Sequence, residues 1–130
     1  MRKLIATLAL LLSASSASCA QPTPPIDVSG LTEASMNFDQ EGVGPFLNEL
    51  SRSLNSNLDA GVLTKSIESL PVEQSRNWEY SVTSEGKAER LVVVAFKDDI
   101  DAPDLAFYSS PDLAARIQTQ LESFAQAQGW

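Results

Sequence analysis

Histidine is missing from this 130-residue chain, and cysteine occurs once. Histidine is the side chain best placed to move protons near neutral pH, so its absence excludes Ser-His-Asp and Cys-His catalysis. A single cysteine excludes an internal disulfide and a zinc–thiolate site. Neither a Gly-rich phosphate loop nor a Gly-x-Ser-x-Gly turn is present. The chemistry that remains is carboxylate catalysis, a serine–lysine pair or calcium held by oxygen ligands, and we expect no cofactor.

Basic residues are also scarce, with 9 lysines and arginines against 17 acidic residues and a net charge of −8. Two of the basic residues, Arg2 and Lys3, belong to the N-terminal signal described next. The rest of the chain therefore carries 7 basic and 17 acidic residues, a formal charge of −10. Such a chain repels phosphate backbones and gains nothing from an anionic lipid surface. We expect no nucleic-acid partner.

No hydrophobic run is long enough to cross a bilayer. The longest, residues 4–12, is about half of the roughly 20 residues that a spanning helix needs. Basic residues precede this run and small residues 13–20 follow it, which is the pattern of a secretory signal. A buried N-terminal helix is the alternative, but Pro22, Pro24 and Pro25 follow at once and would detach it from the domain.

The sole cysteine, Cys19, ends the small-residue stretch Ser16-Ala17-Ser18-Cys19. This stretch resembles the lipobox of bacterial lipoproteins, with Ala17 and Ser18 fitting the pattern and Ser16 standing where an aliphatic residue is usual. The resemblance covers only the signal. It implies that Cys19 carries lipid and becomes the new N-terminus, and that the protein is held at the periplasmic side of the outer membrane. The alternative is ordinary cleavage after Ala20, which releases a soluble periplasmic or secreted protein.

We expect three regions: a signal peptide over residues 1–19, a Pro-rich tether over 20–30 and one domain over 31–130. The tether contains three prolines and no periodicity, which is typical of a semi-rigid spacer. Stable anchoring takes two or more acyl chains rather than one.

The domain is expected to be α+β, with the element order α-α-β-β-β-α. Apolar residues spaced by three and four predict a first helix, a second helix capped by Asp59 and a C-terminal helix that starts at Ser110 and ends at Gly129. Residues 31–42 are ambiguous, either a ragged helix or a loop. The apolar positions are Val43, Phe46, Leu47, Leu50, Leu54 and Leu58, then Val62, Leu63, Ile67 and Leu70, and finally Leu113, Ala114, Ile117, Leu121, Phe124 and Ala125.

Between the second and third helices the period changes to two, which predicts an antiparallel sheet of three strands. A turn at Glu85-Gly86 pairs Val82 with Glu89, Tyr80 with Leu91 and Trp78 with Val93. The apolar run 91–96 predicts a strand that is covered on both faces. The third strand is expected over 105–109. Trp78 and Tyr80 are expected in the core, with a recognition surface as the alternative.

Four acidic residues within seven positions form the only candidate metal site: Asp98, Asp99, Asp101 and Asp104. Carboxylates can gather around calcium, but this segment lacks the glycine and the bidentate acid of an EF-hand loop. We therefore expect a solvated loop. Glu79, Glu85 and Glu89 are candidates for paired acid–base catalysis, although glutamates on a hairpin are usually surface charges.

Val92, Val94 and Phe96 share one face of the expected central strand. Left uncovered, they would form an apolar patch and mark a partner surface. With three helices and one sheet, we expect a helix to cover them.

Two functions remain open. The first is a lipid-anchored, non-enzymatic protein that binds another envelope protein, as an assembly factor, an inhibitor or an immunity-type protein. The second is a small carboxylate-dependent hydrolase or a calcium- or ligand-binding module of the periplasm. A concave pocket with convergent carboxylates would favour the second.

Overall fold

A computed structural model describes residues 26–130, so the expected signal, Cys19 and the first part of the tether lie outside the described residues. The described chain is α+β, as expected, but its antiparallel sheet has five strands rather than three, in the order β1-β5-β4-β3-β2. The elements are β1 (Thr32–Asn37), α2 (Gln40–Ser53), β2 (Asn55–Ser56), α3 (Ala60–Glu68), β3 (Ser75–Ser84), β4 (Lys87–Lys97), β5 (Pro103–Ser109) and α4 (Pro111–Gln128).

The two extra strands lie at the two edges of the sheet. β1 occupies residues that were expected to be a helix or a loop, and it pairs with β5 from Thr32 opposite Ser109 to Asn37 opposite Asp104. β2 is only two residues long and pairs with the end of β3. It follows Leu54, where α2 ends one turn earlier than the apolar spacing indicated. Residues after Leu54 are thereby free to bond to the sheet edge.

The central hairpin forms in the expected register. Val82 lies opposite Glu89, Tyr80 opposite Leu91 and Trp78 opposite Val93. The turn between them has positive φ at both central residues, 52° at Glu85 and 81° at Gly86. A two-residue loop with this geometry matches the twist of the flanking strands, which is why it holds the register.

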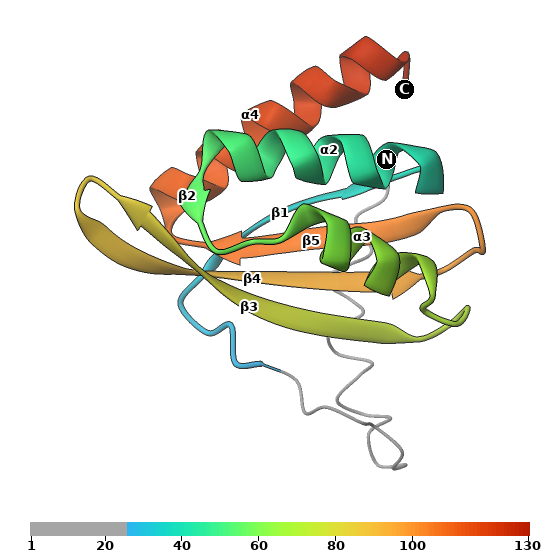
Figure 1. The fold of residues 1–130 in the computed structure, drawn as a ribbon, viewed down its shortest axis with the longest axis horizontal. Coiled ribbons are helices and arrows are strands. Elements are labelled where there is room, and N and C mark those ends of the chain that lie inside the picture. The colour runs from blue at the N-terminus through green and yellow to red at the C-terminus, as the bar shows by residue number, and fades with distance from the viewer. Residues whose placement is uncertain (1–25) are drawn as a thin grey trace.

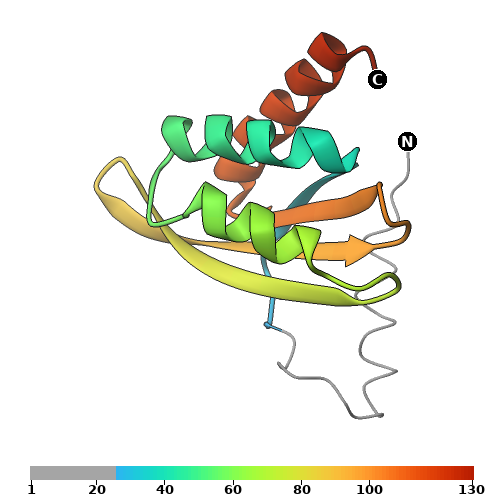
Figure 2. The same cartoon turned by 45° about the vertical axis from the view of Figure 1, so that its right-hand side comes forward.

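All three helices lie on the same face of the sheet (Figures 1 and 2). The main core lies between that face and the helices. Its inward strand residues include Leu91, Val93, Leu105 and Phe107, and its helix residues include Phe46, Leu50, Ile67, Ile117 and Leu121. Trp78 and Tyr80 are partly buried against this core, in agreement with the expectation.

The helix ends follow the local chemistry of their sequences. The side chain of Asp59 accepts a hydrogen bond from the backbone N–H of Val62 at the start of α3. Ser110 caps α4 in the same way, and α4 ends at Gly129 with a φ of 80°. Both caps were predicted. Of the apolar positions named for this helix, Val62 lies on the exposed side, with 62% of it exposed.

The C-terminal end of α4 closes an aromatic cluster. The indole of Trp130 meets the rings of Phe38 and Phe124 edge-on, with centroids 5.7 Å away in each case. Its backbone N–H bonds back to the carbonyl of Ala125. Trp130 thus folds back onto the last turn of α4.

Candidate functional site

The acidic segment connects β4 to β5 and does not form one site. Asp98, Asp99 and Asp101 are exposed, whereas Asp104 is 1% exposed and already belongs to β5. The Asp104 carboxylate accepts a hydrogen bond from the side-chain amide of Asn37 at 2.7 Å, so it links two strands. Within residues 26–130 no group of three acidic or thiol side chains lies close enough to hold a metal ion.

The same segment has a structural role. The backbone N–H of Gln40 donates to the carbonyl of Asp101 at 2.8 Å, and that of Phe38 donates to the carbonyl of Pro103 at 2.9 Å. These bonds attach the start of α2 to the β4–β5 connection. Beside it, Lys97 is 3% exposed and donates its ammonium group to the carbonyl of Glu68, at the end of α3. A cation is stabilised at a helix C-terminus, and sequence analysis missed this pairing because the partner is a backbone atom.

The three candidate catalytic glutamates are held apart by the alternation of the hairpin. The Glu79 carboxylate binds Arg90 on one side, with 2.7 Å between Oε2 and Nε. The Glu89 carboxylate lies on the other side and accepts a hydrogen bond from the hydroxyl of Ser110 at 2.6 Å. Glu85 is exposed in the turn. Because these carboxylates do not converge, the hairpin offers no acid–base pair across one substrate bond.

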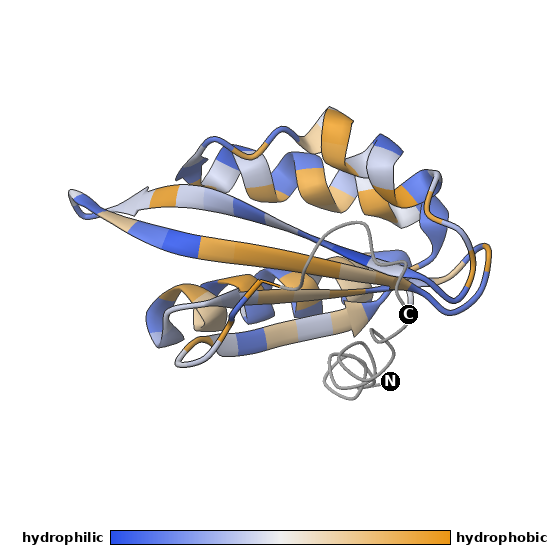
Figure 3. Ribbon diagram, turned by 90° about the horizontal axis from the view of Figure 1, so that it is seen from below, coloured by the Kyte–Doolittle hydropathy of each residue, from blue (hydrophilic) through white to orange (hydrophobic). Residues whose placement is uncertain are grey.

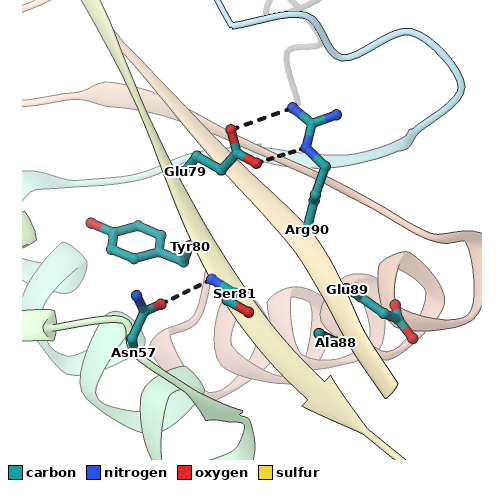
Figure 4. A pocket seen from close by; sticks show the side chains of 7 residues that line it. All are labelled: Asn57, Glu79, Tyr80, Ser81, Ala88, Glu89 and Arg90. Carbon is teal, nitrogen blue, oxygen red and sulfur yellow. Dashed lines mark hydrogen bonds and ion pairs between the residues drawn. The ribbon is translucent and has the colours of Figure 1, made fainter.

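A shallow groove of about 330 Å³ lies over this part of the hairpin. Figure 4 shows the Glu79–Arg90 pair at one end, with the side chains of Tyr80 and Glu89 directed away from it. Asn57 borders the groove and accepts a hydrogen bond from the backbone N–H of Ser81. The charged groups in the groove are already engaged, Glu79 with Arg90 and Glu89 with the Ser110 hydroxyl, so nothing in its lining favours a particular ligand.

The candidate partner surface lies on the face of the sheet opposite the three helices, called here the helix-free face. The expectation that a helix covers Val92, Val94 and Phe96 is therefore wrong. Val92 is nevertheless fully buried, and Val94 and Phe96 are partly buried. Figure 3 shows the apolar stretch along β4 from this side.

The cover over Val92 is the segment that precedes β1, residues 26–31, called here the strap. Its apolar side chains, Ile26, Val28 and Leu31, pack against a second small core. That core consists of Val92, Ala106 and Tyr108. The described part of the Pro-rich segment thus lies against the sheet.

The strap is held by a turn and by one arginine. Asp27 accepts hydrogen bonds from the backbone N–H and the hydroxyl of Ser29, which lower the pKa of its carboxyl group. Arg90 donates from Nη2 to the backbone carbonyl of Asp27 at 2.9 Å. The bond to Glu79 orients the guanidinium and raises the pKa of Arg90. Arg90 therefore clamps the strap to the hairpin.

Tyr108 forms the floor beneath the strap and is 7% exposed. Burial, followed by the negative charge and hydrogen bonding of Glu33, raises its pKa from 10.0 to about 12. The two residues are direct cross-strand neighbours on β5 and β1. Sequence analysis missed this pair because it did not identify β1, and it missed the strap because residues 20–30 were expected to form a tether.

Within residues 26–130 no helix is long and apolar enough to cross a membrane. Comparison with protein-family models, with curated proteins and with solved structures finds no match to this chain.

Proposed function

We propose that this chain is a lipoprotein of the bacterial envelope, attached to the periplasmic side of the outer membrane through lipid on Cys19. Its domain binds another envelope protein and catalyses no reaction. The observation that carries the proposal is the position of the only cysteine, at the end of a lipobox-like stretch and directly before a Pro-rich segment. A lone cysteine in that place has no internal disulfide to form.

The contacts of the domain support the non-enzymatic part of the proposal. Its polar side chains are engaged in holding the fold together: Lys97 on the end of α3, Glu89 on the start of α4 and Asp104 on β1. A catalytic carboxylate or amine has to face its substrate, and these three groups face structural partners. Assembly factor, inhibitor and immunity-type protein are the roles that fit a small, acidic, anchored domain.

The experiment is mass spectrometry of the mature N-terminus from membranes of a two-membrane bacterium. We expect a chain that begins at an acylated Cys19 and fractionates with the outer membrane. The variant Cys19→Ala should lose the lipid and leave the membrane fraction. Ser18→Ala keeps a small residue before the cleavage point and should be processed like the parent. An unmodified chain that begins at Gln21 would refute the anchor.

The binding part is tested separately, by crosslinking in intact cells. We expect one envelope protein to crosslink to the anchored chain in stoichiometric amount. Crosslinking should be much weaker with Cys19→Ala, because the anchor keeps the chain at the same membrane as its partner. Hydrolysis of a periplasmic substrate by the purified domain, abolished in Glu79→Gln or Glu89→Gln, would instead favour the carboxylate-dependent enzyme.

A further inference from the structure

The strap joins the expected anchor to one particular face of the domain. Ile26 is the first described residue, and it packs on the helix-free face with Val28 and Leu31. The three helices all lie on the opposite face (Figure 2). The chain therefore leaves the domain toward Cys19 from the helix-free side.

The length of chain before the strap limits how the domain can turn. Seven peptide links join Cys19 to Ile26. Fully extended, they span at most about 25 Å. The strap lies over β4 and β5, in the middle of the sheet, one strand away from β3 on one side and from β1 on the other.

For the helix layer to reach the membrane, the chain would have to run from the middle of the helix-free face around an edge of the sheet. That path crosses one strand and its side chains, roughly 10 Å. It then passes the sheet and a helix, roughly another 20 Å. The whole path, about 30 Å, exceeds the reach of the seven links.

We propose that the anchored domain is held with its helix-free face toward the membrane and its helix layer toward the envelope space, and that the clamp of Arg90 on Asp27 maintains this orientation. The proposal rests on the lipid at Cys19. It identifies the helix layer, with the adjoining edge of β3, as the surface that a protein partner can reach. The helix-free face, already closed by the strap over Val92, is the side that the partner does not meet.

The clamp matters because its release lengthens the tether. If the strap detaches, the first fixed point moves from Ile26 to Thr32, the first residue of β1, and thirteen links then join it to Cys19. Their reach of about 45 Å exceeds the path around the sheet edge. Loss of Arg90 should therefore let the domain turn over without unfolding it, since the Arg90 side chain is 44% exposed.

The test uses the acylated protein in phosphatidylcholine vesicles whose headgroups carry an acceptor dye. Lipid on Cys19 removes its thiol, so a donor dye on an introduced cysteine reports one site. Ser81→Cys places it on the helix-free face of β3, and Ser123→Cys places it on the exposed side of α4. We expect energy transfer from the Ser81 site to be at least about threefold more efficient, because the two layers separate the sites.

In the Arg90→Ala background this ratio should fall toward one, while backbone hydrogen exchange rises over residues 26–31. Arg116→Ala removes the same side chain from the exposed surface of α4 and should leave the ratio unchanged. Acylated protein with equal transfer from both sites would overturn the orientation and leave the anchor standing. A ratio that persists although the strap exchanges freely would overturn the role of the clamp. A mass without lipid would refute the anchor and the orientation together.

Discussion

Replacing Leu121 by alanine tests whether α4 holds the domain together by burial. Leu121 lies in the middle of α4, is 0% exposed and belongs to the main core, where α4 packs on β1 and β5. A Leu→Ala change at a fully buried site costs about 2–5 kcal/mol, because transfer energy is lost and a cavity remains. The free energy of unfolding of a domain of this size is about 5–15 kcal/mol in total, so this substitution removes a large part of it.

The assay is a thermal melt of the chain without lipid, followed by circular dichroism. For a domain of about 100 residues, each kcal/mol of lost stability lowers Tm by about 4–8 °C, so Leu121→Ala should melt about 8–40 °C below the parent. Ser123→Ala lies two residues along the same helix with its side chain exposed, and should change the stability by less than about 0.5 kcal/mol. A Leu121→Ala protein that melts within about 2 °C of the parent would refute the packing of α4 on the sheet.

Three substitutions test other contacts. A Cβ at Gly42 would lie 2.9 Å from the indole of Trp130, so Gly42→Ala should displace that ring and shift its fluorescence, measured in a Trp78→Phe background. Gly61→Ala, in the first turn of α3, meets nothing closer than 3.6 Å and should raise the stability by about 0.5 kcal/mol, through helix propensity. The pKa of Tyr108, raised from 10.0 to about 12, favours the neutral phenol in the folded state. This contribution of Tyr108 to the free energy of unfolding is complete below pH 10 and should fall by about 2 kcal/mol as the pH rises to 12. Chemical denaturation of the parent and of Tyr108→Phe checks this, and an equal pH dependence of both would contradict it.

The elements that the sequence predicts correctly are those whose signals are local. The hairpin register follows from Glu85-Gly86 and from the alternation on either side of it. The start of α4 follows from Ser110 and Pro111, and its end from Gly129. In each case a few neighbouring residues determine the backbone geometry, so no knowledge of distant partners is needed.

β1 is the clearest failure, and its reason is physical. The strand reads Thr-Glu-Ala-Ser-Met-Asn, and apart from Thr32 it lacks the β-branched and aromatic residues that favour strands. Ala34 and Met36 do alternate inward and are buried. What makes the segment a strand is pairing with β5, about seventy residues later, which no local pattern records. β2 fails for the same reason, since only two residues pair with the end of β3.

That all three helices lie on one face of the sheet could not be predicted from the sequence either. The apolar run of β4 nevertheless carried part of this information. Its continuous character correctly indicated cover on both faces of the strand, and only the nature of the second cover was wrong. Residues 26–31 contain three apolar side chains, Ile26, Val28 and Leu31. So many are not expected in a freely solvated tether. When a strand such as β4 has an apolar face that no helix covers, such residues indicate a segment that packs on the sheet. The strap, residues 26–31, therefore belongs to the domain rather than to the linker.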